Sequence, residues 1–101
     1  KTYKGITATA GGFYGPQGRV LRLPVQDSEL NAKINSFNYN GQKISNLEME
    51  TSAIYGLSKL LGHNAISMNA IIANRTNEVF SENPNKVIED LILYTIDRII
   101  N

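Results

Sequence analysis

The sequence predicts an α/β fold, in which helices cover a sheet of strands. A β-prone run at residues 3–10 and a run at residues 65–73 that is apolar on both faces are typical of strands. Apolar residues recur at helical spacing in three other segments. The predicted order is therefore strand, loop, helix, helix, strand, helix, which favours an α/β layer architecture.

The first strand, at residues 3–10, is expected to end at Gly11-Gly12. Residues 11–18 contain four of the eight glycines and one proline, which is typical of a loop of defined shape. A short second strand is predicted at residues 20–23, where Pro24 stops it.

The first helix is predicted to begin at Asp27-Ser28. Its apolar residues are spaced i, i+4 and i+7 and are Leu30, Ile34 and Phe37. Residues 38–42 have the composition of a turn, and a short β-like segment follows at residues 43–44. The second helix ends at Gly62, a common residue after a helix C-terminus. Its apolar stripe consists of Ala53, Ile54, Leu57, Leu60 and Leu61.

The run at residues 65–73 is predicted to be a central, buried strand, followed by a polar loop at residues 74–82. The last helix opens with Asn83 as N-cap and Pro84 at the first helical position. Its buried side is expected to consist of Ile88, Leu91, Ile92, Thr95, Ile96 and Ile99.

The composition excludes several classes of function. Ten basic and nine acidic residues give a net charge of +1 without a block of like charge, so neither a nucleic acid nor a membrane is expected as partner. No apolar run approaches the roughly 20 residues of a membrane span. The chain has no cysteine, and His63 has no partner at ligand spacing, so no metal site is predicted. We expect a cytoplasmic protein of at most one small domain.

The predicted sheet is incomplete, because a parallel sheet needs covered faces and neighbours on both edges. The chain also starts at Lys1, without Met, directly before the β-prone run. We therefore expect it to be a piece of a longer polypeptide that supplies the missing strands.

Glu48 and Glu50 allow two interpretations. Ser45 and Glu48 have the spacing of a capping box, which would make Glu48 a structural residue. Residues two positions apart face the same side only in an extended segment. With an extended backbone and a helix that starts near Glu50 or Thr51, two carboxylates could accept hydrogen bonds from adjacent ribose hydroxyls. The two interpretations predict different backbones.

The segment Phe13 to Arg19 has the groups to recognise a base. The Gln17 amide supplies one donor and one acceptor, and the Arg19 guanidinium supplies donors only, which suits a uracil-like edge. Phe13 could pack beside the base or the sugar, and the glycines could instead form simple turns. Arg75 follows the predicted central strand, at the position where α/β folds place ligands.

Three motifs, in their order and spacing, resemble the C-terminal part of the uridine phosphorylases, which belong to the nucleoside phosphorylase family. These motifs are Phe13 to Arg19, Asn46 to Thr51 and Ile71 to Thr76, and the resemblance covers essentially the whole chain. The Glu-Met-Glu motif is shared across the family, whereas Gln17-x-Arg19 and Asn74-Arg75-Thr76 are pyrimidine-type features. The resemblance implies a partial three-layer α/β/α domain with an incomplete sheet.

The resemblance also implies the roles of the site residues. The catalytic residues are Gln17 and Arg19. The base-binding residues are Phe13, Gln17, Arg19, Ile72, Ala73 and Arg75. The ribose-binding residues are Glu48, Met49 and Glu50, of which Met49 and Glu50 would contact the ribose and Glu48 would lie beside them. The implied reaction is phosphorolysis of uridine to uracil and ribose 1-phosphate, with inorganic phosphate as co-substrate and no cofactor or metal. Gln17 and Arg19 would stabilise the negative charge that develops on the departing base.

In this family the phosphate ligands lie in the N-terminal half, and some come from a neighbouring subunit. The resemblance therefore implies a homo-oligomer, no phosphate ligand in this segment and no activity of the 101-residue chain by itself. Gly18 departs from the family, in which many members have an acidic residue there. The alternatives are another nucleoside phosphorylase or a nucleosidase, which would need a carboxylate near Asn74, and a non-catalytic fragment that assembles through exposed strand edges.

Overall fold

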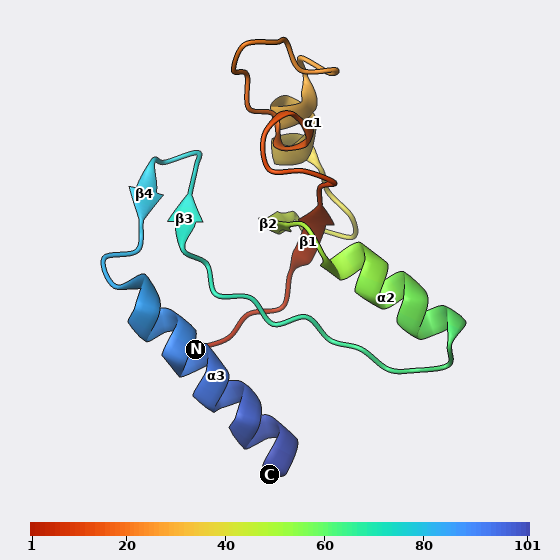
Figure 1. Ribbon diagram of the computed structural model, residues 1–101, viewed down its shortest axis with the longest axis vertical. Helices are drawn as coiled ribbons and strands as arrows, with labels where there is room; N and C mark the ends of the chain where they lie inside the picture. The colour runs from red at the N-terminus through yellow and green to blue at the C-terminus, as the bar shows by residue number, and fades with distance from the viewer. The chain divides into compact units, whose positions relative to one another are not determined.

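The computed structural model describes residues 1–101 and consists of two compact units, residues 1–65 and residues 66–101. The first unit contains β1 (Ile6–Thr9), a 3-10 helix (Gly15–Gln17), α1 (Leu30–Ser36), β2 (Ile44–Glu48) and α2 (Thr51–Leu60). The second contains β3 (Ala73–Asn74), β4 (Val79–Phe80) and α3 (Pro84–Ile100), as Figure 1 shows. This mixture of helices with small sheets is a partial α/β domain, as the sequence predicts.

β1 and β2 lie side by side (Figure 1) and form a parallel pair. Ala8 lies opposite Leu47, and Thr9 lies opposite Glu48. The Ala10 amide extends the pair by donating to the Glu48 carbonyl at 2.9 Å. Because the strands run in the same direction, both end at the same edge of the pair. The glycine-rich loop leaves this edge after β1, and the Met49-Glu50 segment leaves it after β2.

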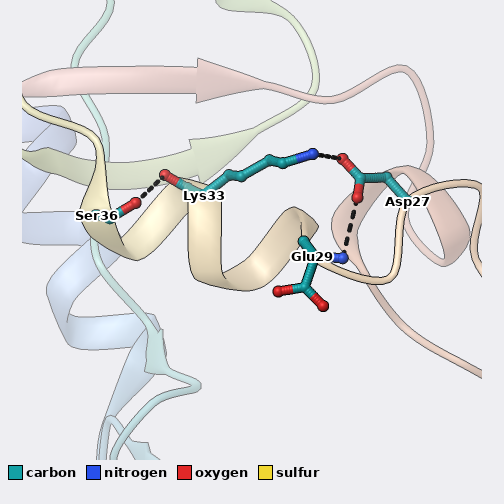
Figure 2. A network of polar contacts seen from close by, with 4 residues as sticks. All are labelled: Asp27, Glu29, Lys33 and Ser36. Atoms are coloured by element: carbon teal, nitrogen blue, oxygen red, sulfur yellow. Dashed lines mark hydrogen bonds and ion pairs between the residues drawn. The ribbon is translucent and has the colours of Figure 1, made fainter.

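α1 begins three residues after Asp27, the predicted start signal. The Asp27 carboxylate accepts a hydrogen bond from the Glu29 amide at 3.0 Å and forms an ion pair with Lys33 at 2.6 Å (Figure 2). The hydrogen bond from Lys33, followed by that from the Glu29 amide, lowers the pKa of Asp27. The Ser36 hydroxyl donates to the Lys33 carbonyl at 3.2 Å in the last turn (Figure 2). Local side-chain contacts thus hold both ends of this short helix.

α2 ends as the sequence predicts. Gly62 has a φ of 74°, and its amide donates to the Lys59 carbonyl at 3.3 Å. The His63 amide donates to the Ser58 carbonyl at 2.8 Å. These two bonds make a Schellman motif, which a residue with positive φ permits, and glycine adopts that conformation at little cost.

The second unit consists of a β-hairpin followed by α3. β3 and β4 are antiparallel, with Ala73 opposite Phe80 and Asn74 opposite Val79. The predicted N-cap is confirmed, because the Asn83 side chain accepts from the Lys86 amide at 3.1 Å. The helix begins at Pro84, the predicted first position.

Three local expectations are wrong for this structure. Residues 20–23 are irregular, and of residues 65–73 only Ala73 is in a strand. A strand needs a partner for its N–H and C=O groups, and no strand of the structure pairs with residues 65–71. The apolar side of α3 is largely exposed rather than buried.

The apolar faces of both units are open. No hydrophobic residue is fully buried in either unit. In the second unit, α3 and the segment before the hairpin line an open hollow of about 440 Å³, whose lining residues are Ile66, Met68, Leu91, Ile92, Thr95, Ile96 and Ile99. None of the helices is both long enough and apolar enough to cross a membrane.

Candidate functional site

The parallel pairing of β1 and β2 brings two predicted binding segments to one edge. Thr9 and Glu48 lie opposite each other at the carboxyl ends of the two strands, 39 residues apart in sequence. Residues 11–19 follow the first strand and Met49-Glu50 the second. The carboxyl edge of parallel strands is where α/β folds bind ligands, because the loops that leave it converge there.

The backbone at Glu48 decides between the two interpretations of the Glu-Met-Glu motif. Residues 44–48 are extended and α2 begins at Thr51, as the ribose-binding interpretation requires. The Ser45 hydroxyl donates to the Ile6 carbonyl at 3.4 Å instead of capping a helix. The prediction of a Ser45–Glu48 capping box is therefore wrong, because both residues belong to the strand β2 and not to the start of a helix.

Glu48 nevertheless caps α2, from the end of the strand. Its Oε2 accepts from the amides of Glu50 at 2.9 Å and Thr51 at 2.7 Å, and from the Thr51 hydroxyl at 2.8 Å. Its Oε1 accepts from the Thr9 hydroxyl at 2.5 Å. Amides at a helix N-terminus have no partner within the helix, so a carboxylate there satisfies them and meets the positive end of the helix dipole.

These contacts decide the charge state of Glu48. Partial burial raises the pKa of its carboxyl. The hydrogen bonds from Thr9, the Glu50 amide and Thr51 together outweigh this effect and lower the pKa from 4.5 to about 2. The side chain is thus an anion at neutral pH with four donors already around it. A carboxylate so engaged has little capacity left for a ligand.

Glu50 is in a different environment from Glu48. It is exposed, and its Oε2 accepts a hydrogen bond from the Met49 amide at 3.2 Å. Met49 is 42% exposed. Of the three residues predicted to bind ribose, Met49 and Glu50 are therefore the accessible ones, while Glu48 holds the backbone that presents them.

The predicted base-binding loop is closed by Arg19. Its guanidinium carbon lies 3.6 Å from the centroid of the Phe13 ring, and its Nη1 donates to the Phe13 carbonyl at 2.7 Å. The Arg19 amide donates to the Tyr14 carbonyl at 3.1 Å, and the Tyr14 ring meets the Phe13 ring edge-on. A cation over an aromatic face is held by the ring's quadrupole, so the loop fixes Phe13 and Arg19 as one unit.

Gln17 lies in the 3-10 turn between Phe13 and Arg19 and is 4% exposed. Phe13, at 51% exposed, is accessible beside the partly exposed Arg19. The structure therefore brings the three residues into one turn, with Phe13 and Arg19 at its surface. Their role in base binding stays a prediction.

The local structure explains why residue 18 is a glycine. Its φ is 76°, and a Cβ there would collide with the side chain of Asn31. The Asn31 side chain also donates to the Gly18 carbonyl at 3.3 Å. A residue with a side chain would need a strained backbone and a displaced Asn31 side chain.

A hollow of about 220 Å³ adjoins this loop without containing the predicted base-binding residues. It is lined by Gly18, Val20, Pro24, Val25, Asp27, Ser28, Leu30 and Asn31. Only Gly18 belongs to the loop, so the hollow lies between the loop and the start of α1 rather than at the strand edge. We therefore place the candidate site at the carboxyl ends of β1 and β2, where the predicted binding segments begin, and not in this hollow.

The remaining predicted residues, Ile72, Ala73 and Arg75, lie in the second unit. The Ser81 amide donates to the Ile72 carbonyl at 2.7 Å, which extends the β3–β4 hairpin by one pair. Arg75 is in the hairpin turn, where its carbonyl accepts from the Glu78 amide at 3.4 Å. Their contribution to a base pocket stays a prediction. No group of three or more His, Asp or Glu side chains gathers in either unit.

The sequence did not point to Thr9, which the structure places against Glu48. A threonine near the end of a β-prone run is unremarkable, and only the strand register brings it to the carboxylate. The sequence shows only that a polar residue ends the predicted strand. It does not show that Glu48, 39 residues further along the chain, is the group that this residue contacts.

Comparison with known proteins identifies the family. The family model described as the phosphorylase superfamily matches residues 1–100. Neither the curated proteins nor the solved structures contain a match. The match covers nearly the whole chain, including the strand-edge segments described above. The chain therefore belongs to the phosphorylase superfamily, which includes the nucleoside phosphorylases.

Proposed function

We propose that this chain carries the nucleoside-binding part of a uridine phosphorylase, which converts uridine and phosphate into uracil and ribose 1-phosphate. The observation that carries the proposal is the parallel pairing of β1 with β2. It places the Phe13–Arg19 turn and the Met49-Glu50 segment after the same edge, one suited to a base and the other to a ribose.

Phosphorolysis breaks the bond between the base and C1′ of the ribose, and phosphate takes the base's place. Negative charge develops on the base as the bond breaks. The Arg19 guanidinium, held on Phe13 and by the Phe13 carbonyl, is a preorganised donor for a base oxygen. Because that charge exists only in the transition state, such a contact raises the rate rather than only the affinity.

On the ribose side, Glu50 is the accessible carboxylate, and a carboxylate accepts hydrogen bonds from neighbouring hydroxyls. We infer that Glu50 binds a ribose hydroxyl, that Met49 packs against the sugar and that Glu48 acts through its hold on this segment. Gln17 would reach the base only if the 3-10 turn opens, because it is buried here.

The phosphate ligands are proposed to come from other parts of the enzyme. No hydrophobic residue is buried, and each strand of the β1–β2 pair has one unpaired edge. We infer that further strands of the same polypeptide, and a second subunit of a homo-oligomer, cover these surfaces and bring inorganic phosphate to the site. The 101 residues alone should then release no uracil.

The test is release of the free base by the intact polypeptide that contains this segment, measured as uracil from uridine and 2′-deoxyuridine and as hypoxanthine from inosine, with and without phosphate. Phosphate-dependent release from uridine supports the proposal. Release without phosphate would indicate a nucleosidase, and preference for inosine a purine phosphorylase. Arg19→Ala should lower kcat/KM for uridine by about 10²-fold. Arg22→Ala, an exposed arginine three residues further along, is the matched control and should leave it unchanged.

A further inference from the structure

The Thr9 hydroxyl makes two hydrogen bonds, one that joins β1 to β2 and one that joins β1 to α2. It donates to Glu48 Oε1 at 2.5 Å and accepts from the Ser52 amide at 3.0 Å. A hydroxyl has one proton and two lone pairs, so Thr9 both supplies a donor to the carboxylate and satisfies an amide. Ser52 is the second residue of α2. Its amide has no partner within the helix, because it lies in the first turn.

Thr9 and Glu48 together satisfy the start of α2. Glu48 accepts from the amides of Glu50 and Thr51, and Thr9 accepts from that of Ser52. Glu50, the N-cap residue, makes no side-chain cap of its own. We call Thr9, Glu48 and the three amides the strand-end clamp. Two strands, rather than the usual N-cap side chain, hold this helix terminus.

The Met49-Glu50 segment lies inside the clamp. It is the two-residue link between Glu48, the last residue of β2, and Thr51, the first residue of α2. The clamp fixes both ends of the link, and Thr51 is 5% exposed and therefore enclosed. Met49 and Glu50 remain exposed. The link can shift only if the strand end or the helix start moves.

We propose that Thr9 is a positioning residue for ribose binding, which it controls by holding Glu48 and α2 so that Met49 and Glu50 meet the sugar. This inference rests on the proposed ribose-binding role of that segment. Thr9 itself touches no substrate. The depressed pKa of Glu48 agrees with it, because a hydroxyl that donates to a carboxylate favours its anion.

Three variants of the intact enzyme test the proposal. Thr9→Val keeps the shape of the side chain and removes both hydrogen bonds, whereas Thr9→Ser keeps both. Thr7→Val is the matched control on the same strand, where the Thr7 hydroxyl contacts Asn46 at 3.5 Å and not the clamp. We expect Thr9→Val to lower kcat/KM for the nucleoside by about tenfold, or about 1.4 kcal/mol. Thr9→Ser should restore it, and KM for phosphate should not change.

A double-mutant cycle separates positioning from a loss of stability. If Thr9 acts through Glu50, Thr9→Val should cost little more once Glu50→Ala has removed the ribose contact. Independent, multiplicative losses would overturn the inference. So would a wild-type rate in Thr9→Val, or an equal loss in Thr7→Val.

The outcomes also distinguish this inference from the proposed function. If the wild-type enzyme turns over no nucleoside, the proposed function fails and the role of Thr9 fails with it. If the wild type is active on inosine rather than uridine, the base assignment fails, and the same cycle on inosine still decides on Thr9. Activity of the wild type with an unaffected Thr9→Val variant defeats the Thr9 inference alone.

Discussion

Replacing Glu48 by Gln should weaken the fold most at neutral pH. Oε2 of Glu48 accepts three hydrogen bonds at the start of α2, and two of them come from Thr51, which is buried. A glutamine oxygen can accept in the same place but carries no charge, and its amide nitrogen faces the Thr9 hydroxyl without accepting from it. The variant therefore keeps an acceptor for the donors at the start of α2 but loses the negative charge and the acceptor for Thr9.

The pKa of Glu48 gives the size of the effect. Burial raises it, but the hydrogen bonds from Thr9, the Glu50 amide and Thr51 take it from 4.5 to about 2. By linkage, that difference corresponds to at most roughly 3 kcal/mol of folding free energy. The side chain is only partly buried, so screening by solvent reduces the expected contribution to roughly 1–2 kcal/mol.

The sign follows from the direction of the pKa. A carboxyl whose pKa is lower in the folded state stabilises the fold above its unfolded pKa, near 4.5, where the unfolded state is also ionised. As the pH falls from about 5 towards 2, the unfolded state binds the proton more readily and the stabilisation disappears. The wild type should thus lose roughly 1–2 kcal/mol between pH 6 and pH 2.5 that Glu48→Gln does not lose.

The assay is urea denaturation of the wild type, Glu48→Gln and Glu89→Gln across that pH range. Glu89 is an exposed glutamate of α3 and serves as the control for removing one charge. The free energies of the wild type and Glu48→Gln should converge at low pH. A difference that stays constant with pH, or a Glu89→Gln curve identical to that of Glu48→Gln, would refute the assigned role of the carboxylate.

Two further predictions concern backbone signals that the structure confirms. Gly18→Ala should lower the free energy of unfolding by roughly 1–2 kcal/mol in urea denaturation, because Gly18 has positive φ and its Cβ would meet Asn31; Gly11→Ala, with open space around it, is the control, and an equal loss in both would contradict this reasoning. Asn83→Ala should destabilise α3 by about 1 kcal/mol in thermal unfolding followed by circular dichroism, because the Lys86 amide loses its acceptor. Asn83→Asp keeps the acceptor and should behave as the wild type, so a loss in Asn83→Asp would count against the cap.

Helix ends were the most predictable part of this chain. Asn83-Pro84 and Gly62 act at the positions expected from the sequence, because caps depend on side chains and φ angles within a few residues. The glycine-rich loop likewise formed a turn around Gly18. By contrast, residues 65–72 have the pattern of a buried strand and remain irregular here. Pattern alone does not make a strand, because the hydrogen bonds come from another segment.

The residue types of the candidate site could be predicted from the sequence, but the contacts of its side chains could not. The residue types in Phe13–Arg19 and Glu48–Glu50 indicated a base and a ribose, and the match of the family model to residues 1–100 supports a nucleoside phosphorylase. The capping-box interpretation made Glu48 a structural residue but named the wrong partner, because its donors are Thr9, Glu50 and Thr51 rather than a helix start at Ser45. Glu48 is surrounded by donors and Glu50 is exposed, although only Met49 separates the two.

The sequence by itself determined the first strand, the end of α2, the start of α3 and the chemical character of the two segments predicted to bind the nucleoside, since each depends on neighbouring residues. Only the tertiary structure decided that Thr9 meets Glu48 and that both segments leave one edge. Those contacts span 39 residues and follow from the register of a parallel strand pair. Register is a property of two segments at once, so no local pattern in either one contains it.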